Sequence, residues 1–257
     1  RYLLKRLWPS RVSQGGEFVE QKLPWGFVIR VRPEEEHGRA LDRLGVVDLS
    51  LTEVLWRLVS PDDVVVDAGA NVGYTSAVLA GALARQGGGE ICSFEPVPST
   101  FEELENNVGR WKGACPEVLF KTYNVALSDT DGTVVMVIPP DFSENRGLPY
   151  VAKRGEALSS PEADRISVPC RALDAFFPGS ARVGVLKIDV EGHELQVLKG
   201  ARRLLEEGRV RDCVFEEHGD YPTDVTRYFE SLKYTVFKVH RAFWRPVLLR
   251  PDSRLPE

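Results

Sequence analysis

Short apolar runs that alternate with amphipathic stretches predict an α/β protein. The apolar runs are rich in valine, isoleucine and phenylalanine, which is typical of buried strands. They lie at residues 64–67, 91–94, 118–125, 183–189 and 211–215. Stretches with helical spacing between and after them cover 75–85, 99–110, 193–205 and 223–232. Because strands alternate with helices, we expect a mostly parallel sheet with helices on both faces and a ligand site at the carboxyl ends of the strands.

The first 60 residues depart from this alternation and predict an N-terminal extension. The runs 18–20 and 27–31 predict a small hairpin, and 34–44 predicts a helix. Ser50 is placed to cap a second helix that begins at Leu51. We expect the division between this extension, residues 1–60, and the main domain, residues 61–257, at the turn before the first parallel strand.

The main domain contains three further departures from this alternation. Residues 139–165 carry four prolines and predict an irregular segment, either a functional lid or a mobile loop. Within it, Asn145 and Arg146 could close over a ligand, or could belong to a disordered loop. The run 166–170 predicts an edge strand, because Pro169 cannot donate a hydrogen bond to a central ladder. Residues 234–239 and 244–249 predict a C-terminal antiparallel strand pair.

The stretch from Val64 to Ser76 joins a buried strand to a helix through a glycine turn. Gly69 and Gly73 allow a tight turn and a close approach of the backbone to a ligand. A dinucleotide fingerprint needs a further glycine where this sequence has Asn71, so the pattern fails at the position that serves a diphosphate. Asp67 would repel phosphates and suits a ligand with a cationic amino group, such as the methionine part of S-adenosylmethionine.

A second acid supports a nucleoside ligand. Glu95 follows the next predicted strand, where a carboxylate is placed to accept hydrogen bonds from a ribose diol. The glycine turn alone would indicate only a doubly wound domain. Together with Asp67 and Glu95, it favours nucleoside binding.

Composition narrows the class of protein. The 257 residues, 43% of them hydrophobic and 28% charged, fit one large soluble domain with or without an extension. A net charge of −5 argues against a nucleic-acid partner, and no apolar run is long enough for a transmembrane segment. Cys92, Cys115, Cys170 and Cys213 have no metal-site spacing. They predict buried free thiols in a reducing compartment, and hence a cytoplasmic protein.

With these residues in place, the chain resembles the FkbM family of S-adenosylmethionine-dependent methyltransferases. Three motifs carry the resemblance, at residues 66–73, 94–96 and 186–194, and the third, Leu-Lys-Ile-Asp-Val-Glu-Gly-His-Glu, is the most specific. The resemblance implies a class I methyltransferase fold and methyl transfer to a hydroxyl of a sugar or a secondary metabolite. It also implies S-adenosylmethionine contacts, which we expect at Asp67, Gly69, Asn71, Gly73, Glu95, Asn124, Ala126 and Asp189.

Methyl transfer to an alcohol needs alignment of the acceptor and a route for its proton. Asp189 ends the fourth parallel strand, next to the expected methyl position, although it could instead cap the following turn. Glu216 and His218 are two residues apart and would face the same side of an extended segment. His193 begins a helix, whose dipole would keep its ring neutral. His193 and His218 could also be solvated surface residues.

Asp189, Glu191, Glu216 and His218 could alternatively gather a divalent cation such as magnesium. The sequence shows no tight ligand spacing, so we expect a metal-free site. Two other functions remain open at this point: an NAD-dependent oxidoreductase on a similar fold, and a nucleoside-binding module without catalysis. The expected partner is a small-molecule or carbohydrate acceptor, whose identity the sequence does not give, and the oligomeric state is equally open.

Overall fold

The structure is a computed structural model that describes residues 18–145, 147–152, 163–241 and 246–253. Its centre is a five-stranded sheet with the order β11-β10-β3-β4-β5, in which every neighbouring pair is parallel. The strands are β3 (Val64–Ala68), β4 (Gly89–Phe94), β5 (Val118–Tyr123), β10 (Val183–Ile188) and β11 (Val210–Phe215). The predicted mostly parallel sheet is confirmed, and β5 ends two residues earlier than expected.

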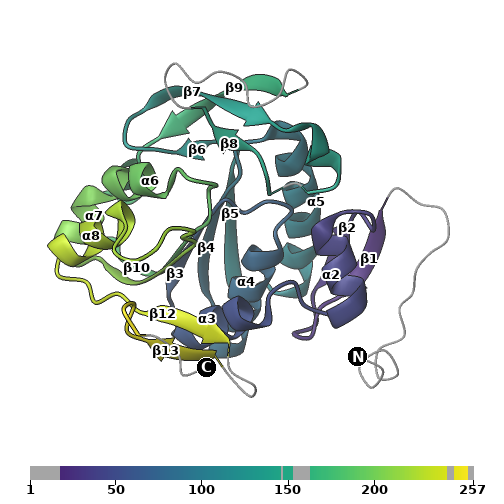
Figure 1. The fold of residues 1–257 in the computed structure, drawn as a ribbon. Helices are drawn as coiled ribbons and strands as arrows, with labels where there is room; N and C mark the ends of the chain where they lie inside the picture. The colour runs from purple at the N-terminus through teal and green to yellow at the C-terminus, as the bar shows by residue number, and fades with distance from the viewer. Residues whose placement is uncertain (1–17, 146, 153–162, 242–245, 254–257) are drawn as a thin grey trace.

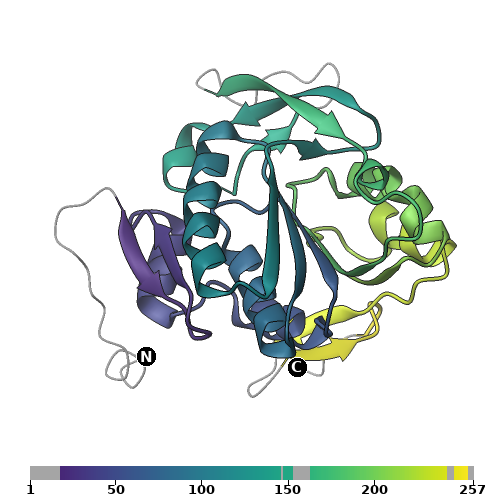
Figure 2. The ribbon, with the colours of Figure 1, turned by 180° about the vertical axis from the view of Figure 1, so that it is seen from behind.

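Alternation along the central strands produces two hydrophobic cores, one on each face of the sheet. Val65 and Val185 face one core, and Val66 and Leu186 face the other. The first core is covered by α4 (Tyr74–Gln86) and α5 (Pro98–Ala114), and the second by α6 (Glu194–Gly200), α7 (Arg202–Glu206) and α8 (Asp224–Ser231). Figure 1 and the reverse view in Figure 2 show these two helical layers around the sheet.

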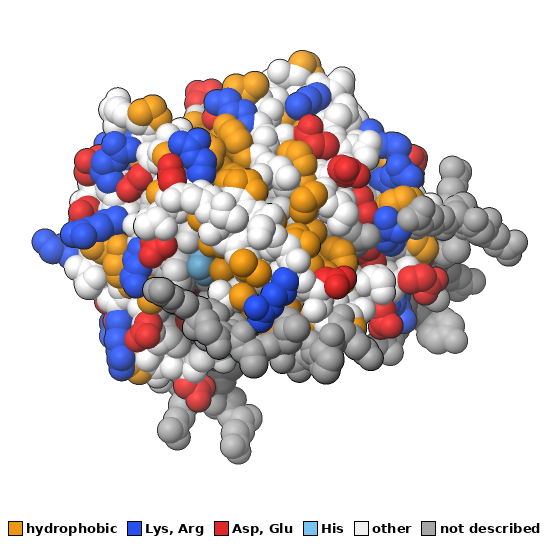
Figure 3. Space-filling view, turned by 90° about the horizontal axis from the view of Figure 1, so that it is seen from above, with side chains coloured by type: hydrophobic (Ala, Val, Ile, Leu, Met, Phe, Trp, Pro, Cys, Tyr) orange, Lys and Arg blue, Asp and Glu red, His pale blue; other side chains and the backbone are white. Residues whose placement is uncertain are grey.

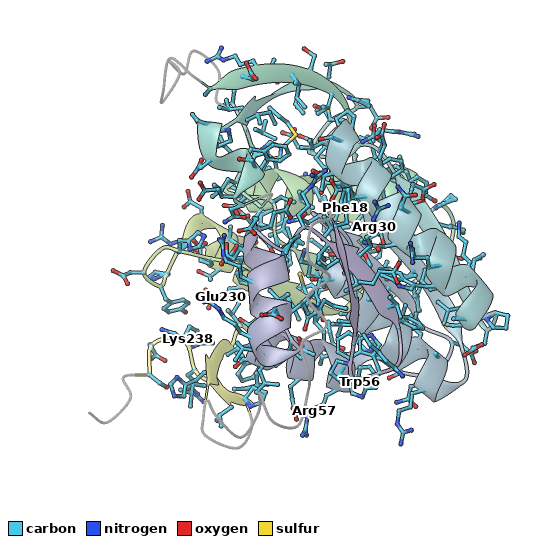
Figure 4. The ribbon with its side chains drawn as sticks, turned by 90° about the vertical axis from the view of Figure 1, so that its right-hand side faces the viewer. Phe18, Arg30, Trp56, Arg57, Glu230 and Lys238 are labelled. Carbon is cyan, nitrogen blue, oxygen red and sulfur yellow. The ribbon has the colours of Figure 1, made fainter. Side chains whose placement is uncertain are left out.

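The N-terminal extension forms the predicted hairpin and helices and packs onto the first core. The hairpin pairs β1 (Val19–Lys22) with β2 (Val28–Val31), followed by α2 (Glu36–Leu44) and α3 (Leu49–Leu58). Leu23, Ile29 and Leu55 share a hydrophobic cluster with residues of α4 and α5. At the hairpin, the guanidinium of Arg30 lies 3.9 Å from the centroid of the Phe18 ring (Figure 4).

One helix cap differs from the prediction. The N-cap of α3 is Asp48, whose carboxylate accepts a hydrogen bond from the Leu51 backbone N–H at 2.8 Å. Ser50 instead lies inside the first turn. The carboxylate of Asp48, two residues earlier, is the group that reaches a free N–H at the helix start.

A second sheet, with the order β6-β9-β7-β8, lies beyond the carboxyl ends of the central strands (Figure 1). Its strands are β6 (Ala126–Leu127), β7 (Gly132–Ile138), β8 (Tyr150–Val151) and β9 (Asp164–Arg171). Seen from above, hydrophobic side chains gather in the middle of this face and charged side chains of both signs surround them (Figure 3).

The expectation that Pro169 marks an edge strand is wrong, because β9 lies between β6 and β7. The register explains how a proline is tolerated there. β6 pairs with β9 only from Cys170 onward, so at Pro169 the strand has a partner on one side only. The segment 139–165 is also more regular than expected, since it contains a short 3-10 helix (Pro140–Ser143) as well as β8. Arg146 lies outside the described residues.

The C-terminal antiparallel pair is confirmed as β12 (Lys238–Arg241) and β13 (Pro246–Leu249). The first strand begins four residues later than predicted, and residues 244 and 245 of the second lie outside the described residues. All four cysteines are free, with three buried and Cys213 half-buried, which corrects the expectation that all four are buried. Within the described ranges, none of the helices has the length and apolar character needed to cross a membrane.

A matched pair of leucine variants tests whether the extension belongs to the main core. Leu55 of α3 is fully buried, whereas Leu119 of β5 is 55% exposed. Leu55→Ala should lower the free energy of unfolding by about 3 kcal/mol, because it removes buried apolar surface and leaves a cavity. Leu119→Ala should change it by less than about 0.5 kcal/mol. Urea unfolding measures both, and equal effects would show that the extension does not stabilise the domain.

Candidate active site at the carboxyl ends of the parallel strands

The turn after β3 is held in a conformation that its residues favour. Gly69 and Gly73 have φ angles of +76° and +98°, and Asn71 has a φ of +51°. Glycine, and to a lesser degree asparagine, adopts this left-handed region readily. A Cβ atom on Gly69 would lie 1.8 Å from the carbonyl oxygen of Asp189, so the strand ends of β3 and β10 meet only because residue 69 is glycine.

A buried ion pair lies directly beneath this turn. In the register of the sheet Lys187 is the partner of Asp67, and the Lys187 Nζ lies 3.0 Å from Asp67 Oδ1. The Ser76 hydroxyl of α4 donates to Asp67 Oδ2 at 2.7 Å. Burial alone would lower the pKa of Lys187, but Asp67 and Asp189 outweigh it, and the net shift is upward. Lys187 is therefore a charged ammonium.

These contacts change the expected role of Asp67. We expected its carboxylate to meet the amino group of a ligand. Its side chain is instead 0% exposed, and the cation that it meets is the ammonium of Lys187. Lys187 also donates to the carbonyl oxygens of Ala68 and Gly69, at 3.3 and 2.8 Å. Asp67 thus holds the glycine turn in place through Lys187.

Glu95 lies at the end of β4, next to the glycine turn. Its carboxylate accepts hydrogen bonds from the backbone N–H of Asn71 and of Val97, both at 2.9 Å. Burial raises the pKa of Glu95 to about 7, although these N–H donors act in the opposite direction. Its contact with a ribose stays a prediction.

Asn124 and Ala126 support the loop that carries Glu95. The Asn124 side-chain amide donates to the carbonyl oxygens of Glu95 and Pro96, at 2.8 and 3.0 Å. Ala126 is buried in β6. Their contact with an adenine stays a prediction.

Three carboxylates gather where β10 and β11 end. Asp189, Glu191 and Glu216 each offer an oxygen within 4.8 Å of the others. Glu191 has a φ of +51°, which is uncommon for a residue with a side chain. Such an arrangement could hold a divalent cation or hydrogen-bond a polyhydroxyl ligand.

The carboxyl groups of Asp189 and Glu216 hydrogen-bond to each other and have pKa values shifted in opposite directions. Burial would raise the pKa of Asp189, but the Lys187 ammonium, 3.6 Å away, outweighs it and the pKa is lowered. Burial and then the Asp189 contact raise the pKa of Glu216 to about 7. The shared proton therefore lies on Glu216, and Asp189 is ionised.

The two predicted histidines have different neighbours: His218 lies next to Glu216, whereas His193 lies next to Ser128. The His218 Nε2 is 3.7 Å from Glu216 Oε1, and the ring is 76% exposed. The His193 Nε2 forms a 2.9 Å hydrogen bond with the Ser128 hydroxyl, beside β6. Burial lowers the pKa of His193 and keeps its ring neutral. Neutrality was expected, but its main cause is burial and not the helix dipole.

A third histidine, which the sequence did not single out, belongs to the same neighbourhood. His37 is the second residue of α2, and the charges of Lys187 and Asp189 both act on its pKa. Gly147 also lies near the site, since a Cβ atom on it would lie 3.8 Å from Glu191 Oε1 and 3.9 Å from Asn71 Nδ2. His37 precedes Gly38 in a predicted helix that shows no motif, so nothing in the sequence placed it there.

Comparison with known proteins identifies the family. The profile described as the methyltransferase FkbM domain matches residues 67–236, which is more than half of the chain. The chain belongs to the FkbM methyltransferase family. The predicted family and fold class, a class I methyltransferase, are therefore confirmed.

Curated relatives of this FkbM methyltransferase carry the names of different methyltransferases. The hexuronic acid methyltransferase AglP of Haloferax volcanii is 29% identical over 205 residues, which cover 79% of this chain and 75% of AglP. The 31-O-demethyl-FK506 methyltransferase FkbM of Streptomyces tacrolimicus is 30% identical over 181 residues, which cover 62% of this chain and 66% of that protein.

A solved structure from Methylobacillus flagellatus, also named methyltransferase FkbM, has 20% sequence identity and a TM-score of 0.45. It covers 68% of this chain, which spans 38% of that longer chain.

A double-mutant cycle tests whether the buried ion pair acts as a unit. Lys187→Met leaves the Asp67 charge buried without its partner and should lower the free energy of unfolding by about 3–5 kcal/mol. Adding Asp67→Asn removes the uncompensated charge, so the double variant should be more stable than Lys187→Met alone. Urea unfolding of the four proteins measures the coupling. Strictly additive losses would show that the two side chains are independent.

Proposed function

We propose that this methyltransferase transfers the methyl group of S-adenosylmethionine to a hydroxyl oxygen of a sugar or secondary metabolite. The observation that carries the proposal is the convergence of Glu95 and Asp189 on the turn at residues 69–73. Three strand ends thereby bring two carboxyl groups to one edge of the sheet.

The residues at this edge fit the proposed cofactor. Glu95 would accept hydrogen bonds from the ribose diol, and the backbone from Gly69 to Gly73 would lie against the nucleoside. The ionised Asp189 suits a cationic ligand and disfavours the diphosphate of NAD. When bound, S-adenosylmethionine supplies an activated methyl group on a sulfonium, so the chain itself contributes binding, orientation and proton transfer.

The acceptor side is formed by Asp189 and Glu216. The ionised Asp189 can accept a hydrogen bond from a hydroxyl, and Glu216, whose pKa is raised to about 7, can donate one in its protonated form. Two differently protonated carboxyl groups fix the orientation of a group that both donates and accepts. Because Glu191 adds a third carboxyl group, the site favours a neutral acceptor over an acidic one.

Two alternatives make different predictions. An NAD-dependent oxidoreductase would need a diphosphate site at the turn, where Asn71 replaces a glycine and the carboxylate of Glu95 accepts the Asn71 N–H. A non-catalytic nucleoside-binding module would bind the cofactor without turning it over.

Calorimetric titration tests the proposal directly. We expect binding of S-adenosylmethionine and S-adenosylhomocysteine, no binding of NAD, and the same affinities with and without magnesium. Transfer of a labelled methyl group to a panel of neutral sugars then separates the enzyme from a binding module. Selective binding of NAD would overturn the proposed function.

Asp189→Asn separates chemistry from cofactor binding. The amide removes the negative charge that orients the acceptor, so kcat should fall by about 100-fold or more. The affinity for S-adenosylhomocysteine, measured by calorimetry, should change by less than about threefold. Asp224→Asn, at an exposed position in α8, is the matched control and should leave both unchanged. Equal losses of kcat and affinity would place Asp189 in the cofactor pocket instead.

A further inference from the structure

Tyr74 is one of the residues that connect the N-terminal extension to the glycine turn. Tyr74 begins α4, directly after Gly73. Its hydroxyl lies 2.8 Å from the Thr52 hydroxyl of α3, and its ring meets Trp25 edge-on at a centroid distance of 6.1 Å. The ring of His37 stacks on Tyr74 with a centroid distance of 6.4 Å and an interplanar angle of 23°. The position of His37 is therefore fixed relative to the turn.

The first turn of α2 is also hydrogen-bonded to the segment 139–145. The Glu36 backbone N–H donates to the carbonyl oxygen of Glu144 at 3.0 Å, and the Asn145 side-chain amide donates to Glu36 Oε2 at 2.7 Å. Asn145 Oδ1 in turn accepts the Gly147 N–H at 2.8 Å. Gly147 lies close to Glu191 and Asn71. The helix start and this segment together adjoin the acceptor side of the site.

Burial keeps the imidazole of His37 neutral, and charged groups of both signs act on its pKa. The charged and titratable groups that face it are Glu36 on its own helix, Lys187 and Asp189 at the end of β10, and Tyr74 on α4. Burial is the largest influence and lowers the pKa of His37, with Lys187 acting in the same direction and Glu36 and Asp189 against it. A neutral ring can accept a proton at pH 7.

We propose that His37 is a catalytic residue that accepts the proton of the acceptor hydroxyl. This inference rests on the proposed function. The acceptor oxygen forms a bond to the methyl carbon as the bond from that carbon to the sulfonium sulfur breaks, and the electron pair of the broken bond stays on the sulfur. The hydroxyl proton passes to the imidazole of His37, whose protonated form the negative charge of Asp189 favours. The imidazolium then releases the proton to water.

His37 is better suited to this step than the carboxyl groups beside it. Asp189 is ionised, but its lowered pKa makes it a weak base. The raised pKa of Glu216, about 7, leaves its carboxyl group protonated in about half of the molecules at neutral pH. Asp189 can instead stabilise the imidazolium, in the way that a carboxylate stabilises a protonated histidine in other general-base pairs.

The first arm of the test needs no acceptor. Histidine ring signals are followed by NMR from pH 4.5 to 8.5 in protein labelled at histidine, with His37→Gln used to assign the signal. We expect the pKa of His37 to lie below its ordinary value and to fall further in Asp189→Asn, because the negative charge that favours the imidazolium is lost. The signals of His193 should not move. An unchanged His37 pKa in Asp189→Asn would overturn the proposal that Asp189 stabilises the imidazolium of His37.

The second arm measures transfer of a labelled methyl group to methyl α-D-glucopyranoside, a neutral sugar probe. His37→Gln should lower the rate by about 100-fold or more and leave the affinity for S-adenosylhomocysteine about unchanged. His240→Gln, in β12, is the matched control and should match the wild type in both. A His37→Gln variant with the wild-type rate would overturn the inference while leaving the proposed function intact. A wild-type chain that binds no S-adenosylhomocysteine would instead overturn the proposed function.

Discussion

The ion pair between Lys187 and Asp67 is the constraint on which the rest of the site depends. Burying two charges is costly unless they meet each other in good geometry, and here the parallel register of β3 and β10 places them as neighbours. The Lys187 ammonium also reaches the carbonyl oxygens of Ala68 and Gly69. One buried cation thus fixes two strand ends and the first residues of the turn.

The same cation sets the protonation of the carboxyl groups at the ends of β10 and β11. Because Lys187 lies 3.6 Å from Asp189, it favours the ionised carboxylate there and leaves the shared proton on Glu216. Lys187 therefore both pairs with Asp67 in the core and keeps Asp189 ionised at the strand end. Replacing Lys187 would disturb the strand ends and the charges at the site together, and the Asp189 variant isolates the second effect.

The sequence determined the local parts of this arrangement but not the contacts between distant segments. Valine runs, the glycine turn and the alternation of elements were enough to predict the sheet, its two helical layers and the edge that carries Asn71, Glu95 and Asp189. The partner of Asp67 could not be predicted, because it depends on the register between two strands far apart in the chain. The interior position of β9 was missed for a similar reason, since Pro169 is unpaired on only one side.

His37 shows the same limit in the functional site. Its helix was predicted, but its stacking on Tyr74 depends on how the extension packs against α4, which no local pattern encodes. The family profile begins at residue 67, so α2 lies before the matched region, whereas Asp67, Glu95 and Asp189 lie within it. If His37 accepts the proton, the matched region holds the cofactor and the extension completes the acceptor side. Acceptor preference could then change through the extension without disturbing the buried pair that holds the cofactor turn.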